Sequence, residues 1–154
     1  MYTLGVVADS HYHREMLERV AEKFREVDAV VHLGDCWRDG EELAMLTGKP
    51  VHAVRGNCDS VMDGPAEAEF EIEGVKLIIT HGDRYNVKYS PFRLNMRAAE
   101  KGCSLCLYGH THVADETQVR GVTMVNPGAL KYGKYALVTL DKGVIDTEFH
   151  TLDE

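Results

Sequence analysis

Polar residues of one chemical kind follow five apolar, strand-like segments of the chain. They are Asp9-Ser10-His11, Gly34-Asp35, Gly56-Asn57-Cys58-Asp59, His81-Gly82 and Gly109-His110-Thr111-His112. Imidazole and carboxylate groups gathered in one place are ligands for divalent transition metals such as Mn, Fe, Co, Ni or Zn. The residue types in this pattern therefore predict a metal site rather than five unrelated polar loops.

The number of candidate ligands indicates more than one ion. The seven candidates are Asp9, His11, Asp35, Asn57, His81, His110 and His112. A tetrahedral zinc takes only four ligands, and a structural zinc normally uses cysteine, which makes that alternative weaker. Seven ligands suit two divalent ions about 3.5 Å apart that share a carboxylate.

The first third of the chain predicts a βαβαβ order. Apolar and β-branched runs predict strands, and apolar residues at helical spacing predict helices. The expected elements are strand 3–8, helix 14–27, strand 28–33, helix 40–48 and strand 51–54. Such units have parallel strands, and their ligands bind beyond the carboxyl ends of those strands. All the polar clusters would therefore meet at one edge of the sheets.

The rest of the chain is rich in hairpins. Alternation of apolar and polar residues, broken by glycine, is typical of hairpins. We expect hairpins at 67–82, 115–126 and 134–151, a helix at 90–102 and a buried strand at 103–109. Residues 1–154 would form a single domain in which two sheets pack together with helices outside.

Composition excludes several classes of protein. The chain has 154 residues, 44% of them hydrophobic, and a net charge of −8. The negative charge argues against long nucleic acid as a partner, but not against small phosphate esters bound through cations. No apolar run approaches the ~20 residues of a membrane span, and we see no secretory leader at the N-terminus. We therefore expect a cytoplasmic protein with no membrane contact and four reduced cysteines.

The order of the motifs DSH, GD, GNCD, THG, GHTH and NPG resembles that of the calcineurin-like metallophosphoesterase superfamily. The likeness is greatest to its small bacterial and archaeal phosphodiesterases, and it covers about residues 4–128. It implies an α/β fold, a four-layer αββα sandwich of two mixed sheets. It also implies that the first ion binds Asp9, His11, Asp35 and His112, and that the second binds Asn57, His81, His110 and the bridging Asp35.

The resemblance also implies a reaction. A hydroxide shared by two divalent ions would attack the phosphorus of a small phosphoester, and the ions and Asn57 would stabilise the charge that develops. The residues expected to take part in catalysis are Asn57, Cys58, Asp59 and His110.

Cys58 departs from the family pattern. Many members read GNH[DE], whereas this chain reads Gly56-Asn57-Cys58-Asp59. A thiol with an ordinary pKa of about 8.5 is neutral and cannot act as an imidazolium. We therefore expect diesters to be preferred over dianionic monoesters.

Two alternatives stay open at this stage. One is a phosphomonoesterase that acts on nucleotides or proteins. The other is a non-catalytic interaction scaffold of the same fold, although this chain keeps every ligand position. Exposed edge strands would also permit a homodimer. The sequence assigns no role to His13, to Asp83 or to the arginines in the loops.

Overall fold

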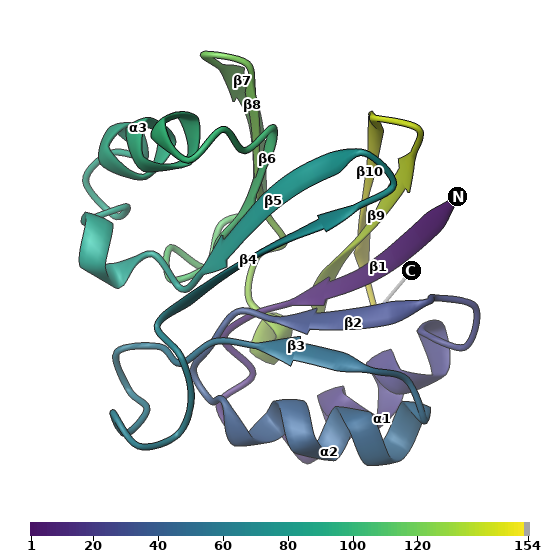
Figure 1. Ribbon diagram of the computed structural model, residues 1–154. Helices are drawn as coiled ribbons and strands as arrows, with labels where there is room; N and C mark the ends of the chain where they lie inside the picture. The colour runs from purple at the N-terminus through teal and green to yellow at the C-terminus, as the bar shows by residue number, and fades with distance from the viewer. Residues whose placement is uncertain (153–154) are drawn as a thin grey trace.

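The computed structural model describes residues 1–152, which form two five-stranded sheets packed face to face (Figure 1). The first sheet is mixed, with β1 parallel to β2 and antiparallel to β9. Its strands, in spatial order, are β10 (Val144–Thr151), β9 (Lys134–Asp141), β1 (Tyr2–Val7), β2 (Ala29–His32) and β3 (Val51–Ala53).

The second sheet is also mixed. Strands β5, β6 and β8 are parallel to one another, and the two edge strands are antiparallel to their neighbours. In spatial order the strands are β4 (Glu67–Ile72), β5 (Val75–Thr80), β6 (Leu105–Leu107), β8 (Val122–Asn126) and β7 (Asp115–Val119).

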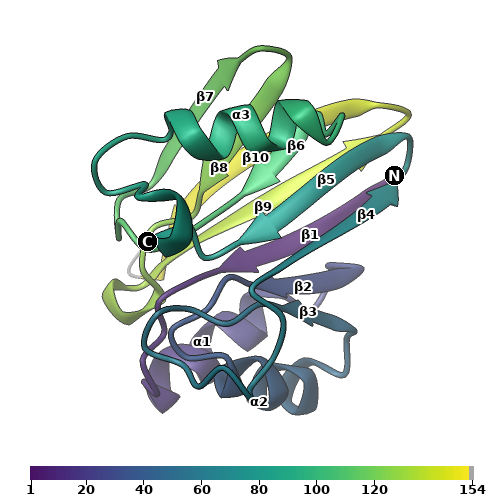
Figure 2. The ribbon, with the colours of Figure 1, turned by 60° about the vertical axis from the view of Figure 1, so that its left-hand side comes forward.

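Helices cover both outer faces, so the four-layer αββα arrangement of two mixed sheets is confirmed (Figure 2). Helices α1 (Arg14–Lys23) and α2 (Arg38–Thr47) pack on the first sheet, and α3 (Phe92–Glu100) packs on the second. Two short 3-10 helices, η1 (Asp83–Tyr85) and η2 (Leu130–Tyr132), lie in the loops after β5 and β8. No helix within residues 1–152 has the length and apolar character needed to cross a bilayer.

Three apolar layers hold the sandwich together. The central layer lies between the sheets and includes Leu4, Leu77 and Leu107, all fully buried. The second layer lies under α1 and α2, and the third lies under α3. Cys103 and Cys106 belong to the third layer as buried free thiols, in keeping with a packing role.

Helix α1 is shorter than its periodicity predicts. The apolar spacing runs to Val27, but the helix ends at Lys23, and the Phe24 N–H bonds to the carbonyls of Val20 and Ala21. Phe24 and Val27 are nevertheless buried. The hydrophobic spacing therefore predicts which residues are buried, but not where the helix ends. The turn after the helix keeps Phe24 and Val27 facing the sheet.

The parallel strands place the polar clusters at one edge of the sandwich. The segments that follow β1, β2 and β3 in the first sheet, and β5 and β6 in the second, all emerge at this edge (Figure 1). Two backbone bonds between loops illustrate the convergence: Asp9 N–H to the Gly34 carbonyl at 2.9 Å, and Gly109 N–H to the His81 carbonyl at 3.0 Å. Each of these bonds joins two loops of the same sheet. The His110 N–H, which donates to Asp9 Oδ2 at 3.1 Å, joins the loops of the two sheets.

Gly5, in the middle of β1, is required by the ring of Phe24. A Cβ at this position would lie 2.7 Å from two ring atoms of Phe24, which is fully buried. We expect Gly5→Ala to lower the free energy of unfolding by about 1–3 kcal/mol, the usual cost of overpacking. Urea unfolding of the metal-free protein measures this loss.

A double-mutant cycle isolates the cause. Phe24→Leu removes the ring, so Gly5→Ala should cost less in that background than in the wild type. Gly102→Ala is the matched control, because a Cβ there meets nothing within 4 Å and only the positive φ of 73° opposes it. Its cost should be the same in both backgrounds; equal costs for Gly5→Ala in both would refute the steric explanation.

Candidate metal centre

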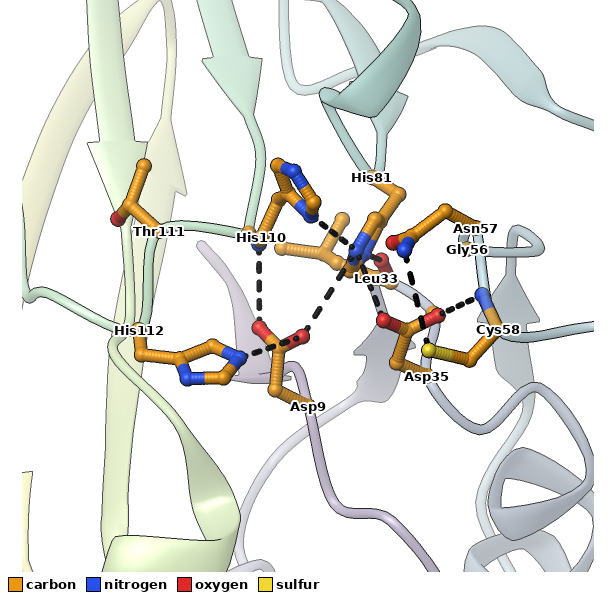
Figure 3. Close-up of polar contacts among 12 residues, drawn as sticks. Asp9, Leu33, Asp35, Gly56, Asn57, Cys58, His81, His110, Thr111 and His112 are labelled. Carbon is orange, nitrogen blue, oxygen red and sulfur yellow. Dashed lines mark hydrogen bonds and ion pairs between the residues drawn. The ribbon is translucent and has the colours of Figure 1, made fainter. Parts of the chain in front are cut away.

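Six of the seven predicted ligands form two neighbouring groups (Figure 3). Asp9, His11 and His112 form the first group; Asp35, His81 and His110 form the second. Within each group the potential ligand atoms all lie within 4.8 Å of one another. Both groups combine one carboxylate with two imidazoles, the ligand set predicted for a divalent transition metal.

The Oδ1 atom of Asp9 is the point on which three imidazoles converge. Its distance to Nε2 is 3.4 Å for His112, 3.7 Å for His81 and 3.9 Å for His11. Asp9 Oδ1 and His11 Nε2 are buried and have no hydrogen-bond partner within the described residues. Buried polar atoms normally have partners. The lone pairs of these two atoms face each other and are not used in hydrogen bonds, so a cation could bind between them. The residues present therefore suit a metal ion.

His81 links the two carboxylates. Its Nδ1 lies 2.7 Å from the Leu33 carbonyl oxygen, to which it donates, and this leaves Nε2 facing the site. Nε2 lies 3.2 Å from Asp35 Oδ2 and 3.1 Å from His110 Nδ1. Metal-binding histidines are commonly oriented in this way, because a bond from one ring nitrogen fixes the other toward the ion.

The backbone of the site is strained. Five of the six residues in the two groups are non-glycine residues with positive φ: Asp9 (54°), His11 (48°), Asp35 (52°), His110 (72°) and His112 (66°). Each such residue costs free energy and persists only where its surroundings enforce it, and such positions cluster at functional sites. The strain is a second, independent indication that these residues serve a function.

The loop with the GNCD motif lies beside the second group. The Cys58 N–H donates to Asp35 Oδ1 at 2.9 Å, and the thiol of Cys58 is exposed. Asn57 is exposed as well, and its amide N–H donates to Cys58 Sγ at 3.8 Å (Figure 3). Asn57 belongs to neither group, which contain only histidines and acids; its role as a ligand stays a prediction.

Asp59 faces the backbone. Its carboxylate accepts N–H groups from Asp35 at 3.0 Å, Trp37 at 3.0 Å and Gly56 at 2.8 Å. These bonds fasten the Asp35 loop to the GNCD loop. A Cβ on Gly56 would lie only 2.0 Å from Asp35 Oδ1, so glycine is needed for the two loops to approach this closely.

The NPG turn supports the loop that carries His110 and His112. Asn126 is buried, and its amide donates to the Gly109 carbonyl at 3.1 Å and to the Thr111 hydroxyl at 2.9 Å. Its own carbonyl oxygen accepts the Gly128 N–H at 2.9 Å. Ala129, the residue after the turn, is fully buried.

Two arginines contact the segment that follows the GNCD motif: Arg38, the first residue of α2, and Arg55, in the loop after β3. Arg55 donates to the Gly64 carbonyl at 2.6 Å, and Arg38 lies 3.6 Å from the carboxylate of Asp63.

Lys131 is a cation near the site that the sequence did not point to. Its positive charge influences the pKa values of Asp9, His11 and His112. Its backbone N–H donates to the Asp9 carbonyl at 3.2 Å. Its place three residues after the NPG turn was the available signal.

The two carboxylates differ in charge state when no metal is bound. Burial raises the pKa of Asp9 to about 6, against the opposing effect of His81. Burial would raise the pKa of Asp35 too, but its hydrogen bond and ion pair with His81 lower the pKa below the ordinary value. The same two carboxylates raise the pKa of His81 despite its burial. The first group therefore carries the carboxylate that most needs a cation.

This difference predicts that Asp9→Asn stabilises the metal-free protein. Because the pKa of Asp9 is raised to about 6, its ionised form opposes folding above that pH, and the penalty disappears near pH 4. At pH 7.5 the penalty is on the order of 3 kcal/mol. Thermal unfolding with a chelator present should give a higher midpoint for Asp9→Asn at pH 7.5 and little difference at pH 4. A lower midpoint at pH 7.5 would contradict the assignment.

Comparison with known proteins identifies relatives of this chain. The family model described as the calcineurin-like phosphoesterase superfamily domain matches residues 2–143. The probable metallophosphoesterase YsnB of Bacillus subtilis is 30% identical over 152 residues, covering 94% of this chain and 88% of its own. The phosphodiesterase YfcE of Escherichia coli K12 is 30% identical over 158 residues, covering 87% of this chain and 82% of its own.

Solved structures share the fold. A predicted phosphoesterase of Streptococcus pneumoniae TIGR4 superposes with a TM-score of 0.84 at 29% identity, covering 99% of this chain and 90% of the other. Vps29 of Entamoeba histolytica superposes with a TM-score of 0.78, covering 97% and 98%, but at 17% identity this likeness shows the fold alone. The family model and the relatives with metallophosphoesterase names show that this chain belongs to the calcineurin-like phosphoesterase superfamily.

Proposed function

We propose that the protein is a divalent-metal-dependent phosphodiesterase that hydrolyses small phosphodiesters. The observation that carries this proposal is the pair of adjoining ligand groups around Asp9 and Asp35. The family supports phosphoesterase activity, and the preference for diesters is our inference. We expect two ions, each Mn, Ni, Fe, Co or Zn, because the same nitrogen and oxygen ligands accept all of these metals.

The chain's own residues divide the work between binding and positioning. When bound, two divalent ions supply positive charge and a water acidic enough to ionise at neutral pH. The exposed amide of Asn57 is placed to donate a hydrogen bond to a phosphoryl oxygen, which would stabilise charge that develops there. The imidazole of His110 lies beside that of His81. Asp59 fixes the loop that presents Asn57 and Cys58 by accepting the Gly56 N–H.

The chemistry of Cys58 supports the preference for diesters. Partial desolvation of this largely exposed residue and the nearby charge of Asp35 raise the pKa of the Cys58 thiol above its ordinary value. The thiol is therefore neutral at physiological pH. It offers no positive charge to the second negative charge of a monoester, and it is a poor proton donor for a reluctant leaving group.

Metal-stripped protein should hydrolyse bis(p-nitrophenyl) phosphate when Mn²⁺ or Ni²⁺ is added, and p-nitrophenyl phosphate more slowly. Release of p-nitrophenolate measures both reactions. The variant His11→Gln should lose at least 100-fold in kcat/KM, since it removes one ligand of the first group. His52→Gln is the matched control, because His52 stacks on Phe70 with ring centroids 4.7 Å apart, outside both ligand groups. Metal-independent turnover would contradict the proposal.

Cys58→His should shift the enzyme toward monoesters. An imidazolium at this position would attract the dianion and protonate the leaving group, so the diester-to-monoester ratio of kcat/KM should fall about tenfold. Cys58→Ser, which keeps a small neutral side chain, should leave the ratio near that of the wild type. Equal ratios for the two variants would rule out our explanation of Cys58.

A second function stays open as an alternative. Vps29 shares the fold, which keeps the non-catalytic interaction scaffold as the alternative. The complete ligand groups of this chain argue against it, and failure of the purified protein to bind any divalent ion would restore it. A cytoplasmic location and a homodimer stay predictions from the sequence.

A further inference from the structure

Beneath the first ligand group lies a buried polar cluster of Ser10, His32 and Asp39. Ser10 and His32 are fully buried, and Asp39 is 4% exposed. The three residues come from different elements: Ser10 lies between Asp9 and His11, His32 ends β2, and Asp39 is in the first turn of α2. The proposed hydrolysis assigns no step to any of them.

The hydrogen bonds of the cluster run in one direction. The Gly34 N–H donates to His32 Nδ1 at 3.1 Å, so the proton of the neutral imidazole must be on Nε2. His32 Nε2 then donates to Ser10 Oγ at 2.8 Å, and the Ser10 hydroxyl donates to Asp39 Oδ2 at 2.5 Å. The Tyr12 N–H donates to the same carboxylate oxygen at 2.9 Å. Every donor therefore has its acceptor.

This order of groups excludes a serine nucleophile. In a hydrolytic triad the histidine stands between the serine and the acid, and the serine hydroxyl donates to the histidine. Here the serine stands in the middle, its proton is committed to Asp39, and its side chain has no access to solvent. The hydrogen bonds of the cluster instead stabilise the conformation of the segment that contains Ser10.

The conformation that it holds is the strained loop of the first ligand group. Asp9, His11 and Tyr12 all have positive φ, at 54°, 48° and 63°. Ser10 and the Tyr12 N–H are both tied to Asp39, one on each side of His11. His11 Nε2 has no hydrogen-bond partner among the described residues, so this nitrogen depends on the backbone for its position.

We propose that the His32–Ser10–Asp39 chain of hydrogen bonds positions Asp9 and His11 to bind the first metal ion. The inference rests on the proposed metal centre and adds three positioning residues to it. Groups that orient metal ligands typically contribute 10- to 100-fold to metal affinity. The contribution should fall mainly on one of the two ions, because Asp35 accepts the Cys58 N–H and His81 donates to the Leu33 carbonyl, contacts that do not involve the cluster.

The test is calorimetric titration of metal-stripped protein with Mn²⁺. We expect Ser10→Ala to weaken one of the two binding steps by 10- to 100-fold and to change the other by less than about threefold. Asp39→Ala removes the acceptor of the same hydroxyl from the helix side and should have the same effect, so a folding failure of one variant leaves the other. Ser10→Thr keeps the hydroxyl and should restore most of the affinity.

Asp28→Ala is the matched control. Asp28 Oδ2 also accepts a backbone N–H, that of Thr3 at 2.8 Å, but near the start of β1, away from the ligand groups. This variant should bind both ions like the wild type. The visible spectrum of the Co²⁺-loaded protein gives a second readout, since a displaced His11 alters the coordination.

The outcomes separate the two proposals. Wild-type affinities for both ions in Ser10→Ala and Asp39→Ala, or equal losses in Asp28→Ala, would overturn the positioning role and leave the metal centre standing. A wild-type protein that binds no Mn²⁺ would overturn the proposed function and this inference together.

Discussion

Two carboxylates buried at the same edge of the sandwich, Asp9 and Asp35, set the main electrostatic constraint on this structure. Like charges brought close together out of water repel one another, and burial alone disfavours both ionised forms. Four imidazoles lie beside these carboxylates, and three of them face a single oxygen of Asp9. His81 offsets much of the charge of Asp35, while Asp9 is left with a raised pKa. The site is thus incomplete without added positive charge.

The fold supplies what this arrangement needs. Parallel strands in both sheets deliver polar loops to one edge, and the buried layers on either side of each sheet fix the loops' starting points. Loop-to-loop hydrogen bonds do the rest: Asp59 joins two loops of the first sheet, and Asn126 supports the loop of His110 and His112. Five of the six candidate ligands have positive φ angles, which non-glycine residues disfavour. The surrounding contacts therefore hold these side chains in place at a cost in backbone free energy.

Sequence alone predicted the strands, the helices and the clustering of the ligands, because hydrophobic period and strand direction determine them. Helix α1 was predicted too long, since Phe24 and Val27 are buried in a turn that continues the helical spacing. The clustering around Asp9 Oδ1, the three backbone bonds of Asp59 and the part played by Asp39 had no sequence signal. Each depends on which way a side chain points after packing, and residue spacing does not encode that.

The contact between Gly56 and Asp35 links the loop proposed to contact substrate with the loop proposed to bind metal. A single missing Cβ lets the loop that presents Asn57 and Cys58 rest directly on a metal-ligand loop. The two loops are therefore packed directly against each other, and Asp59 accepts N–H groups from both of them. In the proposed enzyme, a change in the length or shape of the GNCD loop is therefore expected to alter metal binding at Asp35 as well. Substrate selectivity and metal affinity would then change together.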